Sequence, residues 1–125
     1  MKNIFIIVLL VLTFTNNIGY ARDVISITAK NLSSEYDANE IAGDKKYKGK
    51  RLLIKGVVDE VSKDIMGDVY VSLVGMNEMQ VVQCYFEDGD KLDELSKGDV
   101  VLIEGECDGF LMVNVIIKNS KLIRN

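Results

Sequence analysis

The chain has 125 residues, of which 15 are Lys or Arg and 19 are Asp or Glu, so its formal net charge is −4. An acidic protein is a poor general partner for nucleic acid or for an anionic membrane surface. The sequence has no His, which removes the usual general base and the commonest neutral metal ligand.

The first segment has the order of regions that is typical of a secretory signal peptide. Lys2 supplies a positive start, an uninterrupted apolar run extends from Ile4 to Leu12, and Gly19 and Ala21 fit a small-x-small cleavage site. A membrane-spanning helix needs roughly 20 apolar residues, and this run is about half that length. We therefore expect residues 1–21 to be a removable signal peptide, with an uncleaved anchor as the alternative.

The mature chain, residues 22–125, has the size of one small domain. We expect it to be exported to the periplasm or secreted, with no stable membrane span after signal cleavage. No Cys lies near Ala21, so the chain as written has no residue there that could take a lipid.

The start of the mature chain predicts a helix. Residues 23–30 alternate partly and predict either an extended lead-in or the beginning of that helix. Residues 31–47 predict the helix itself, with Ser33 or Ser34 as the N-cap and several Lys near the end, where they complement the helix dipole. Gly43 weakens the helical pattern.

After the helix the apolar period changes to two, which predicts strands. We expect five of them, at residues 51–61, 69–74, 80–86, 100–107 and 110–117. Gly56 often marks a bulge or a sharp bend in such a strand, and Asp108-Gly109 is a strong hairpin signal. A short helical stretch within residues 87–97 separates the third strand from the fourth. This order predicts an all-β domain with a flanking helix: a five-stranded OB-fold-like barrel preceded by an N-terminal helix.

Short motifs spread over residues 25–118 resemble those of one protein family. They are Ile27-Thr28-Ala29-Lys30-Asn31-Leu32, Tyr47-Lys48-Gly49-Lys50, Val82-Gln83-Cys84-Tyr85-Phe86, Leu95-Ser96-Lys97-Gly98-Asp99-Val100 and Gly105-Glu106-Cys107-Asp108-Gly109. The pattern resembles the tRNA_anti-like family of exported bacterial OB-fold proteins, many of which look like lipoproteins. The resemblance implies the OB-fold. The family name records similarity to anticodon-binding domains, not a demonstrated RNA partner, and this chain departs from its lipoprotein-like relatives in lacking a Cys at the end of the signal.

Strand alternation predicts a ligand-binding face on the outside of the barrel. The side chains expected there are Lys55, Tyr70, Ser72, Gln83 and Tyr85. The two Tyr would lie on the surface where OB-folds stack bases or sugars, with Lys55 at its border. The alternative is that the N-terminal helix covers this face and buries both Tyr.

A basic run lies between the predicted helix and the first strand of the barrel. Its members are Lys45, Lys46, Lys48, Lys50 and Arg51. These side chains could contact a phosphate backbone. The alternative is a solvated helix end, where cations complement the dipole.

Two Cys residues, Cys84 and Cys107, are expected in the third and fourth strands. A disulfide between them would close a loop of about 24 residues. In an OB-fold the fifth strand lies between these two strands, so same-face neighbours are about 9–10 Å apart, beyond the usual reach of a disulfide. A disulfide and a pair of buried free thiols both remain open.

No catalytic motif, metal-ligand spacing or cofactor motif is present, so we expect neither an enzyme nor a metal or cofactor. The acidic residues between 87 and 94 do not have EF-hand spacing. We expect an exported, non-catalytic binding module whose ligand is a protein, a peptide or saccharide-like. The alternatives are a single-stranded nucleic-acid-binding OB domain, which the acidic charge disfavours, and a structural protein of the cell envelope.

Overall fold

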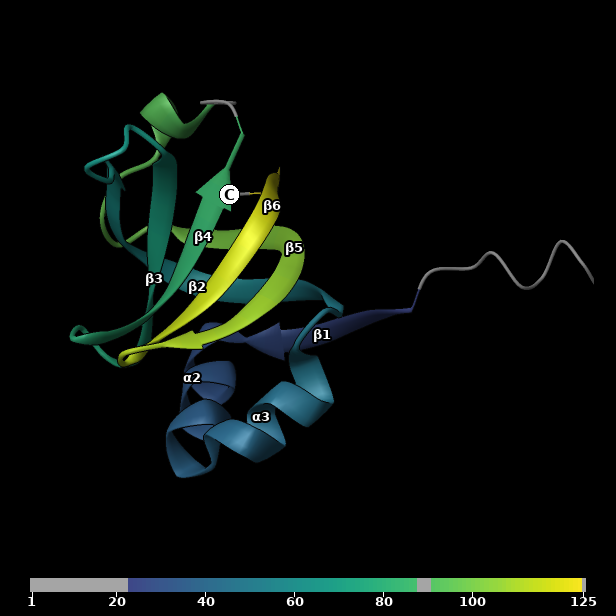
Figure 1. Ribbon diagram of the computed structural model, residues 1–125. Helices are drawn as coiled ribbons and strands as arrows, with labels where there is room; N and C mark the ends of the chain where they lie inside the picture. The colour runs from purple at the N-terminus through teal and green to yellow at the C-terminus, as the bar shows by residue number, and fades with distance from the viewer. Residues whose placement is uncertain (1–22, 88–90, 125) are drawn as a thin grey trace, which may run out of the picture.

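The computed structural model describes residues 23–87 and 91–124 (Figure 1). The signal peptide predicted for residues 1–21 lies outside the described residues. The strands are β1 (Val24–Thr28), β2 (Arg51–Lys63), β3 (Val69–Asn77), β4 (Gln80–Phe86), β5 (Val100–Leu111) and β6 (Asn114–Arg124), and the helices are α2 (Ala29–Ala38), α3 (Glu40–Tyr47) and the 3₁₀ helix η1 (Leu92–Glu94). In the described part of the chain, none of these helices has the length and apolar character needed to cross a bilayer.

Strands β2 to β6 form a closed barrel. Their order along the sheet is β1-β2-β3-β4-β6-β5, and a further pairing between β2 and β5 closes the ring. Strand β6 lies between β4 and β5, parallel to the former and antiparallel to the latter. The predicted five-stranded OB-fold-like barrel is therefore confirmed.

The predicted N-terminal helix is not the first element of the domain. The short strand β1 precedes it and pairs in parallel with the beginning of β2. The helix then begins earlier than predicted, because Thr28 is its N-cap and accepts a 3.1 Å hydrogen bond from the Asn31 backbone N–H. The predicted caps, Ser33 and Ser34, lie inside α2.

Asn39 divides the predicted single helix into α2 and α3. Its backbone is extended, and its side-chain Oδ1 accepts a 3.0 Å hydrogen bond from the Ala42 backbone N–H, so it caps the second helix. The break brings Gly43 against the ring of Tyr36, where a Cβ atom would lie 2.7 Å from the ring carbon Cδ1. The Gly that weakens the helical pattern therefore allows the two helices to pack closely.

The two helices close one end of the barrel (Figure 1). Leu32 and Tyr36 of α2 and Tyr47 of α3 are buried in the common core. The Tyr36 ring stacks on Phe110 with centroids 5.5 Å apart, and its hydroxyl lies 3.4 Å from Cys107 Sγ. The apolar faces of the helices are thus used to cover the end of the barrel.

Gly56 marks a close approach between elements. A Cβ atom there would lie 3.0 Å from Ala29 Cβ and 3.0 Å from Leu73 Cδ1, so only Gly lets α2 sit this close to β2. The irregularity in the pairing of β2 with β3 lies slightly later, between Val58 and Glu60.

The hairpin predicted at Asp108-Gly109 is wrong, because both residues lie within β5. Gly109 has φ +96° and lies where the pairing of β5 with β6 shifts register after Cys107, so it forms a bulge. The chain turns at Met112 and Val113 instead, with Met112 at φ 60°. As a result β5 and β6 extend beyond their predicted ends.

Cys84 and Cys107 are free, buried thiols. Each pairs with Ile117, the first from β4 and the second from β5, so β6 lies between them. The two Cys therefore do not form the disulfide that the sequence allowed. The intervening strand β6 keeps their side chains beyond the reach of a disulfide bond.

Candidate ligand-binding face

The outer face of β3 and β4 carries two cross-strand pairs of polar side chains. Tyr70 lies opposite Tyr85, and Ser72 lies opposite Gln83. The two Tyr rings are partly exposed, with centroids 5.6 Å apart and planes tilted by 51°. The alternate residues of the same strands, such as Val71, point into the core and are buried. The structure therefore brings these four predicted site residues together, but Ser72 is only 5% exposed, so a ligand on this face would meet Tyr70, Gln83 and Tyr85 rather than Ser72.

Hydrogen bonds hold both Tyr side chains in place. Gln83 Nε2 donates to Tyr85 Oη at 3.2 Å, and Tyr70 Oη donates to Glu60 Oε1 at 3.2 Å. Burial and the Glu60 carboxylate raise the pKa of Tyr70, and burial and the Asp64 carboxylate raise the pKa of Tyr85. Both side chains therefore remain neutral phenols at physiological pH and offer ring faces to a ligand.

Helix α2 does not cover this pair of Tyr. It meets β3 and β4 at their hairpin end, where Ser33 Oγ donates to the Gln80 carbonyl at 3.4 Å and accepts from the Met76 backbone N–H at 3.2 Å. Tyr70 and Tyr85 stay partly exposed. The Tyr pair on the outer face of β3 and β4 is thus open to a ligand, and the alternative in which the helix buries both Tyr is wrong.

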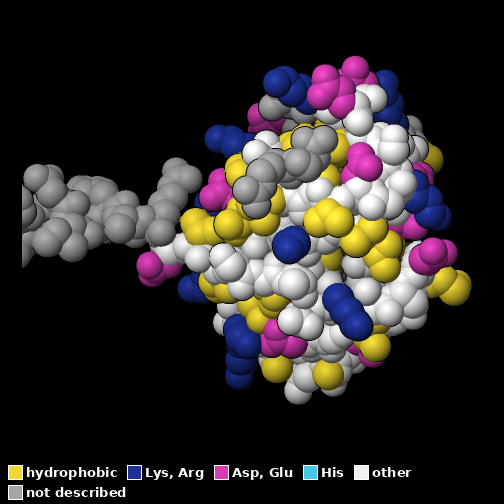
Figure 2. All heavy atoms as spheres, turned by 180° about the vertical axis from the view of Figure 1, so that it is seen from behind, with side chains coloured by type: hydrophobic (Ala, Val, Ile, Leu, Met, Phe, Trp, Pro, Cys, Tyr) yellow, Lys and Arg dark blue, Asp and Glu magenta, His cyan; other side chains and the backbone are white. Residues whose placement is uncertain are grey.

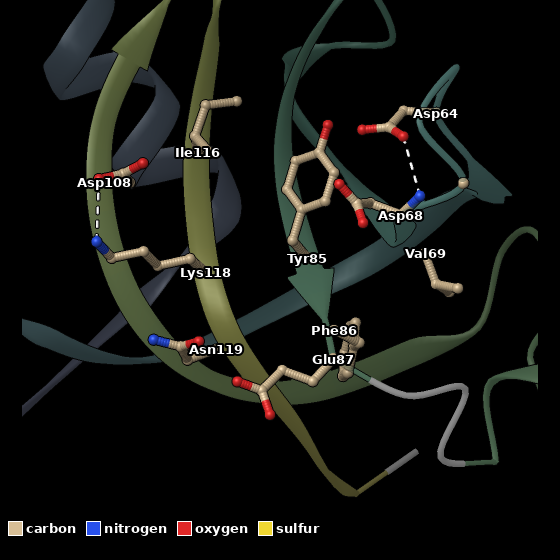
Figure 3. A pocket seen from close by; sticks show the side chains of 11 residues that line it. Asp64, Asp68, Val69, Tyr85, Phe86, Glu87, Asp108, Ile116, Lys118 and Asn119 are labelled. Atoms are coloured by element: carbon tan, nitrogen blue, oxygen red, sulfur yellow. Dashed lines mark hydrogen bonds and ion pairs between the residues drawn. The ribbon is translucent and has the colours of Figure 1, made fainter.

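A groove lies beside Tyr85, with a volume of about 600 Å³. In Figure 3, Tyr85 lies between Ile116 and Lys118 of β6 on one side and Asp64 and Asp68 of the β2–β3 loop on the other. The charged side chains that line the groove are Asp64, Asp68, Glu87, Asp108 and Lys118. The Tyr85 end of the groove is therefore acidic.

The loop between β2 and β3 holds these carboxylates through its own backbone. Asp64 Oδ1 accepts hydrogen bonds from the backbone N–H groups of Met66 at 2.9 Å and Asp68 at 3.0 Å. This is the local turn-forming bonding that Asp favours, and it brings the Asp64 carboxylate near Tyr85.

Lys118 is the cation of the groove, and two carboxylates neutralise it. Its Nζ lies 3.3 Å from Glu106 and 3.4 Å from Asp108. Hydrogen bonds to these two groups raise the pKa of Lys118. These two ion pairs therefore already neutralise part of the positive charge of Lys118.

A second hollow of about 420 Å³ adjoins the groove, and both are lined by Glu87 and Asn119. Its basic members are Arg51 and Lys121, and Ser120 also lines it. The face therefore has an acidic end beside the Tyr pair and two basic side chains farther away, Arg51 at the start of β2 and Lys121 late in β6.

The predicted basic run does not form one continuous strip. Lys46 makes a 2.8 Å ion pair with Glu35 and lies over the Tyr47 ring, whereas Arg51 makes a 3.4 Å ion pair with Glu104. The other members, Lys45, Lys48 and Lys50, are exposed on α3 or just after it. Figure 2 shows the side opposite Figure 1, where the basic and acidic side chains of the described residues are scattered rather than gathered by sign.

Lys55 lies away from the Tyr pair. It pairs with Thr28 of β1 and Leu102 of β5, whereas Tyr70 pairs with Ser62, farther along β2. Lys55 and Ser62 are therefore separated by about 20 Å along β2. The predicted position of Lys55 at the border of the face is therefore wrong.

Several residues of this face were missed from the sequence. Glu60, Asp64 and Asp68 surround the Tyr pair, and the spacing Asp64-x-x-x-Asp68 before a strand is the signal that could have identified the loop. Ser120 and Lys121 were missed because the last strand was expected to end at residue 117.

The sequence pattern that defines the tRNA_anti-like family matches residues 3–121. The chain belongs to the tRNA_anti-like family. The resemblance seen in the sequence motifs is therefore confirmed. No curated protein matches the chain by sequence.

Two solved structures share the fold. One is a proposed nucleic acid-binding lipoprotein from Klebsiella pneumoniae subsp. pneumoniae, with a TM-score of 0.63 and 19% identity over 82% of this chain and 92% of that one. The other is the asparaginyl-tRNA synthetase of Entamoeba histolytica in complex with asparaginyl-adenylate, with a TM-score of 0.50 and 16% identity over 84% of this chain. This chain spans 24% of the synthetase, so the likeness concerns one part of that enzyme.

Proposed function

We propose that this tRNA_anti-like protein is an exported, non-catalytic OB-fold module that binds single-stranded nucleic acid on the outer face of β3 and β4. The observation that carries the proposal is the partly exposed pair of Tyr70 and Tyr85, whose rings lie 5.6 Å apart beside an open groove. Bases stack on aromatic side chains of OB-folds irrespective of sequence, at about 1–3 kcal/mol per base.

The relatives support a nucleic-acid ligand over the other ligands considered. The family is named for its similarity to anticodon-binding domains, and nucleic-acid binding is also proposed for the structurally similar Klebsiella lipoprotein. Among the described residues, no group of His, Cys, Asp or Glu has an arrangement that could hold a metal ion. A binding role fits these features better than a catalytic one.

The charge of the protein sets the expected character of this binding. With a net charge of −4, the protein as a whole repels a phosphate backbone. Stacking on Tyr70 and Tyr85 therefore supplies most of the binding free energy, and phosphate contacts supply a smaller, salt-sensitive part.

Export is part of the proposal. The signal-like residues 1–21 support it, and so does the structural similarity to a lipoprotein. The mature product would consist of residues 22–125, without a lipid, because no Cys lies near Ala21. Its ligand would then be extracellular or periplasmic nucleic acid rather than cytoplasmic tRNA.

A second candidate function is favoured by the carboxylates of the groove. Among the described lining residues, four carboxylates, those of Asp64, Asp68, Glu87 and Asp108, accompany the one cation Lys118. A protein or peptide partner with exposed Lys or Arg side chains would complement this charge, and the Tyr rings would make cation–π contacts with it.

One titration separates the two candidates. The full chain would be expressed in a bacterial host, and the exported product would be titrated with a fluorescein-labelled oligothymidylate and, separately, with a labelled deca-arginine peptide. We expect the oligonucleotide to bind and to bind more weakly at higher salt. Binding of the peptide alone would overturn the nucleic-acid proposal and support the second candidate.

A further inference from the structure

We propose that Arg51, Ser120 and Lys121 form a phosphate subsite that holds the backbone of a single strand whose bases stack on Tyr70 and Tyr85. This inference rests on the proposed function and adds the place of the phosphate contacts. It keeps Arg51 from the predicted basic run and replaces the four lysines of that run by Ser120 and Lys121 in the late part of β6.

The first observation is a pair of polar groups without partners. Ser120 is only 8% exposed, and neither its Oγ nor the Nε of Arg51 has a hydrogen-bond partner among the described residues. Both residues line the 420 Å³ hollow, together with Lys121. Both atoms are themselves covered by the protein, so a ligand in the hollow reaches them only after a small shift of the two side chains. Because buried polar groups are normally satisfied, their lack of partners marks the hollow as a candidate polar subsite.

The second observation is the backbone irregularity that positions these groups. Strand β5 pairs Glu104 with Lys121 and Glu106 with Lys118, so two residues of β6 lie opposite the single Gly105. Asn119, within this bulge, has φ 51°. A Cβ atom at Gly105 would lie 3.0 Å from Ser120 Oγ, so the Gly makes room for the hydroxyl. Bulges of this kind often re-aim a side chain next to a functional site.

The third observation is the distribution of charge along the face. At the Tyr85 end, Asp64 and Asp68 would repel a phosphodiester. In the second hollow, Arg51 and Lys121 would attract one, and the two hollows share Glu87 and Asn119 as lining residues. A strand that stacks on the Tyr pair would therefore direct its backbone toward β6.

Among the described residues, two carboxylates oppose this subsite, those of Glu87 and Glu104. Glu104 makes one contact with Arg51, at 3.4 Å to Nη2, and the Arg51 side chain stays 21% exposed, so the other terminal N–H groups of the guanidinium are left for a phosphate. Glu87 also lines the hollow and would repel the ligand. Replacement of Glu87 by Gln is therefore expected to tighten oligonucleotide binding.

The test compares Lys121→Gln with Lys45→Gln in the exported product. Both Lys are exposed, and both substitutions remove one positive charge, but Lys45 lies on α3. The probes are an oligothymidylate of about 12 nucleotides and its uncharged methylphosphonate counterpart. With two phosphates neutralised, raising salt fourfold should weaken oligothymidylate binding about sevenfold for the unaltered protein and for K45Q, but less than about threefold for K121Q.

Ser120→Ala supplies a second, independent readout. Removal of an unpartnered buried hydroxyl should leave Tm unchanged or raise it, whereas a purely structural hydroxyl would lower Tm when lost. We expect S120A to weaken oligothymidylate binding about threefold or more without a fall in Tm. K121Q should not change binding of the methylphosphonate probe, because that probe has no charged backbone. S120A should weaken it less than it weakens oligothymidylate binding, because each methylphosphonate keeps only one neutral oxygen that can accept a hydrogen bond.

The outcomes separate the subsite from the proposed function. If K45Q reduces the salt dependence as much as K121Q does, or if neither variant changes it while the protein still binds, the subsite is overturned and the proposed function stands. If the unaltered protein binds neither oligonucleotide, both are overturned. K121Q alone remains decisive if S120A does not fold, because Lys121 is exposed.

Discussion

The hydroxyl of Tyr36 on α2 lies 3.4 Å from the thiol of Cys107 on β5, inside the core. With the stacking of the same ring on Phe110, this contact joins the helices to the barrel. Burial and the hydrogen bond to Cys107 raise the pKa of Tyr36, so the group stays neutral. The helices are therefore a part of the core, and the face with the Tyr pair remains open.

Replacement of Tyr36 by Ala should destabilise the protein strongly. The ring is fully buried, so its loss should reduce the free energy of unfolding by about 3–5 kcal/mol. Tyr36→Phe keeps the ring and should cost about 1 kcal/mol or less. Urea unfolding followed by circular dichroism measures both. Ile41→Ala, at a residue of α3 that is 71% exposed, is the control and should change little. A small effect of Tyr36→Ala would contradict this role of the helices.

Cys84 and Cys107 should be reduced and slow to react in the native protein. Burial raises the pKa of both thiols, so little thiolate forms near neutral pH. A chromogenic disulfide reagent should react slowly with native protein and should detect two thiols per chain after denaturation without reductant. Detection of none after denaturation would show that a disulfide forms and would contradict the strand order at Ile117.

The ion pair between α2 and α3 should contribute stability that depends on pH. Hydrogen bonds from Lys46 and Tyr47 lower the pKa of Glu35 from its ordinary value of 4.5. The ion pair therefore contributes its full stability above about pH 4.5, the pKa of Glu35 in the unfolded chain. This stability is lost as the pH falls through the lower pKa that Glu35 has in the folded protein. Because the Glu35 side chain is 39% exposed and that of Lys46 is 62% exposed, solvent screens the pair and the effect is small.

The measurement is the free energy of unfolding between pH 6 and about pH 3 for the unaltered protein and for Glu35→Gln. The unaltered protein should lose more stability over this range than the variant. Glu78→Gln, in the exposed β3–β4 turn, is the matched control and should leave the pH dependence unchanged. Equal pH profiles for the unaltered protein and Glu35→Gln would remove the basis for this prediction.

The outer face could be predicted from the sequence because it depends on local alternation. The third strand was predicted with its correct bounds, residues 80–86, and its period of two fixes which side chains point outward. Tyr70 and Tyr85 therefore lie together as the pattern indicated. The prediction for Lys55 failed because it depended on how far β2 continues along the barrel before it meets β3.

The end of the barrel could not be predicted in the same way. A Gly after Asp favours positive φ, which suits a bulge as well as a turn, and the choice depends on what packs against it. Here the side chains of Asp44 and Lys48 pack beside Gly109, and β5 continues to Leu111 before the chain turns at Met112. The bulge at Asn119 likewise interrupts the alternation of inward and outward side chains in β6. The sequence pattern therefore did not predict the last residues of this strand, which include Ser120 and Lys121.

The central claim is that single-stranded nucleic acid binds on the Tyr pair. Its most direct test is the affinity of the exported product for a labelled oligothymidylate. The unaltered protein is compared with the double variant Tyr70→Ala/Tyr85→Ala. Loss of two stacking contacts of about 1 kcal/mol or more each predicts at least about 30-fold weaker binding. Lys55→Ala, on a distant part of β2, should leave the affinity unchanged. Equal affinity in the double variant and the unaltered protein would contradict the claim.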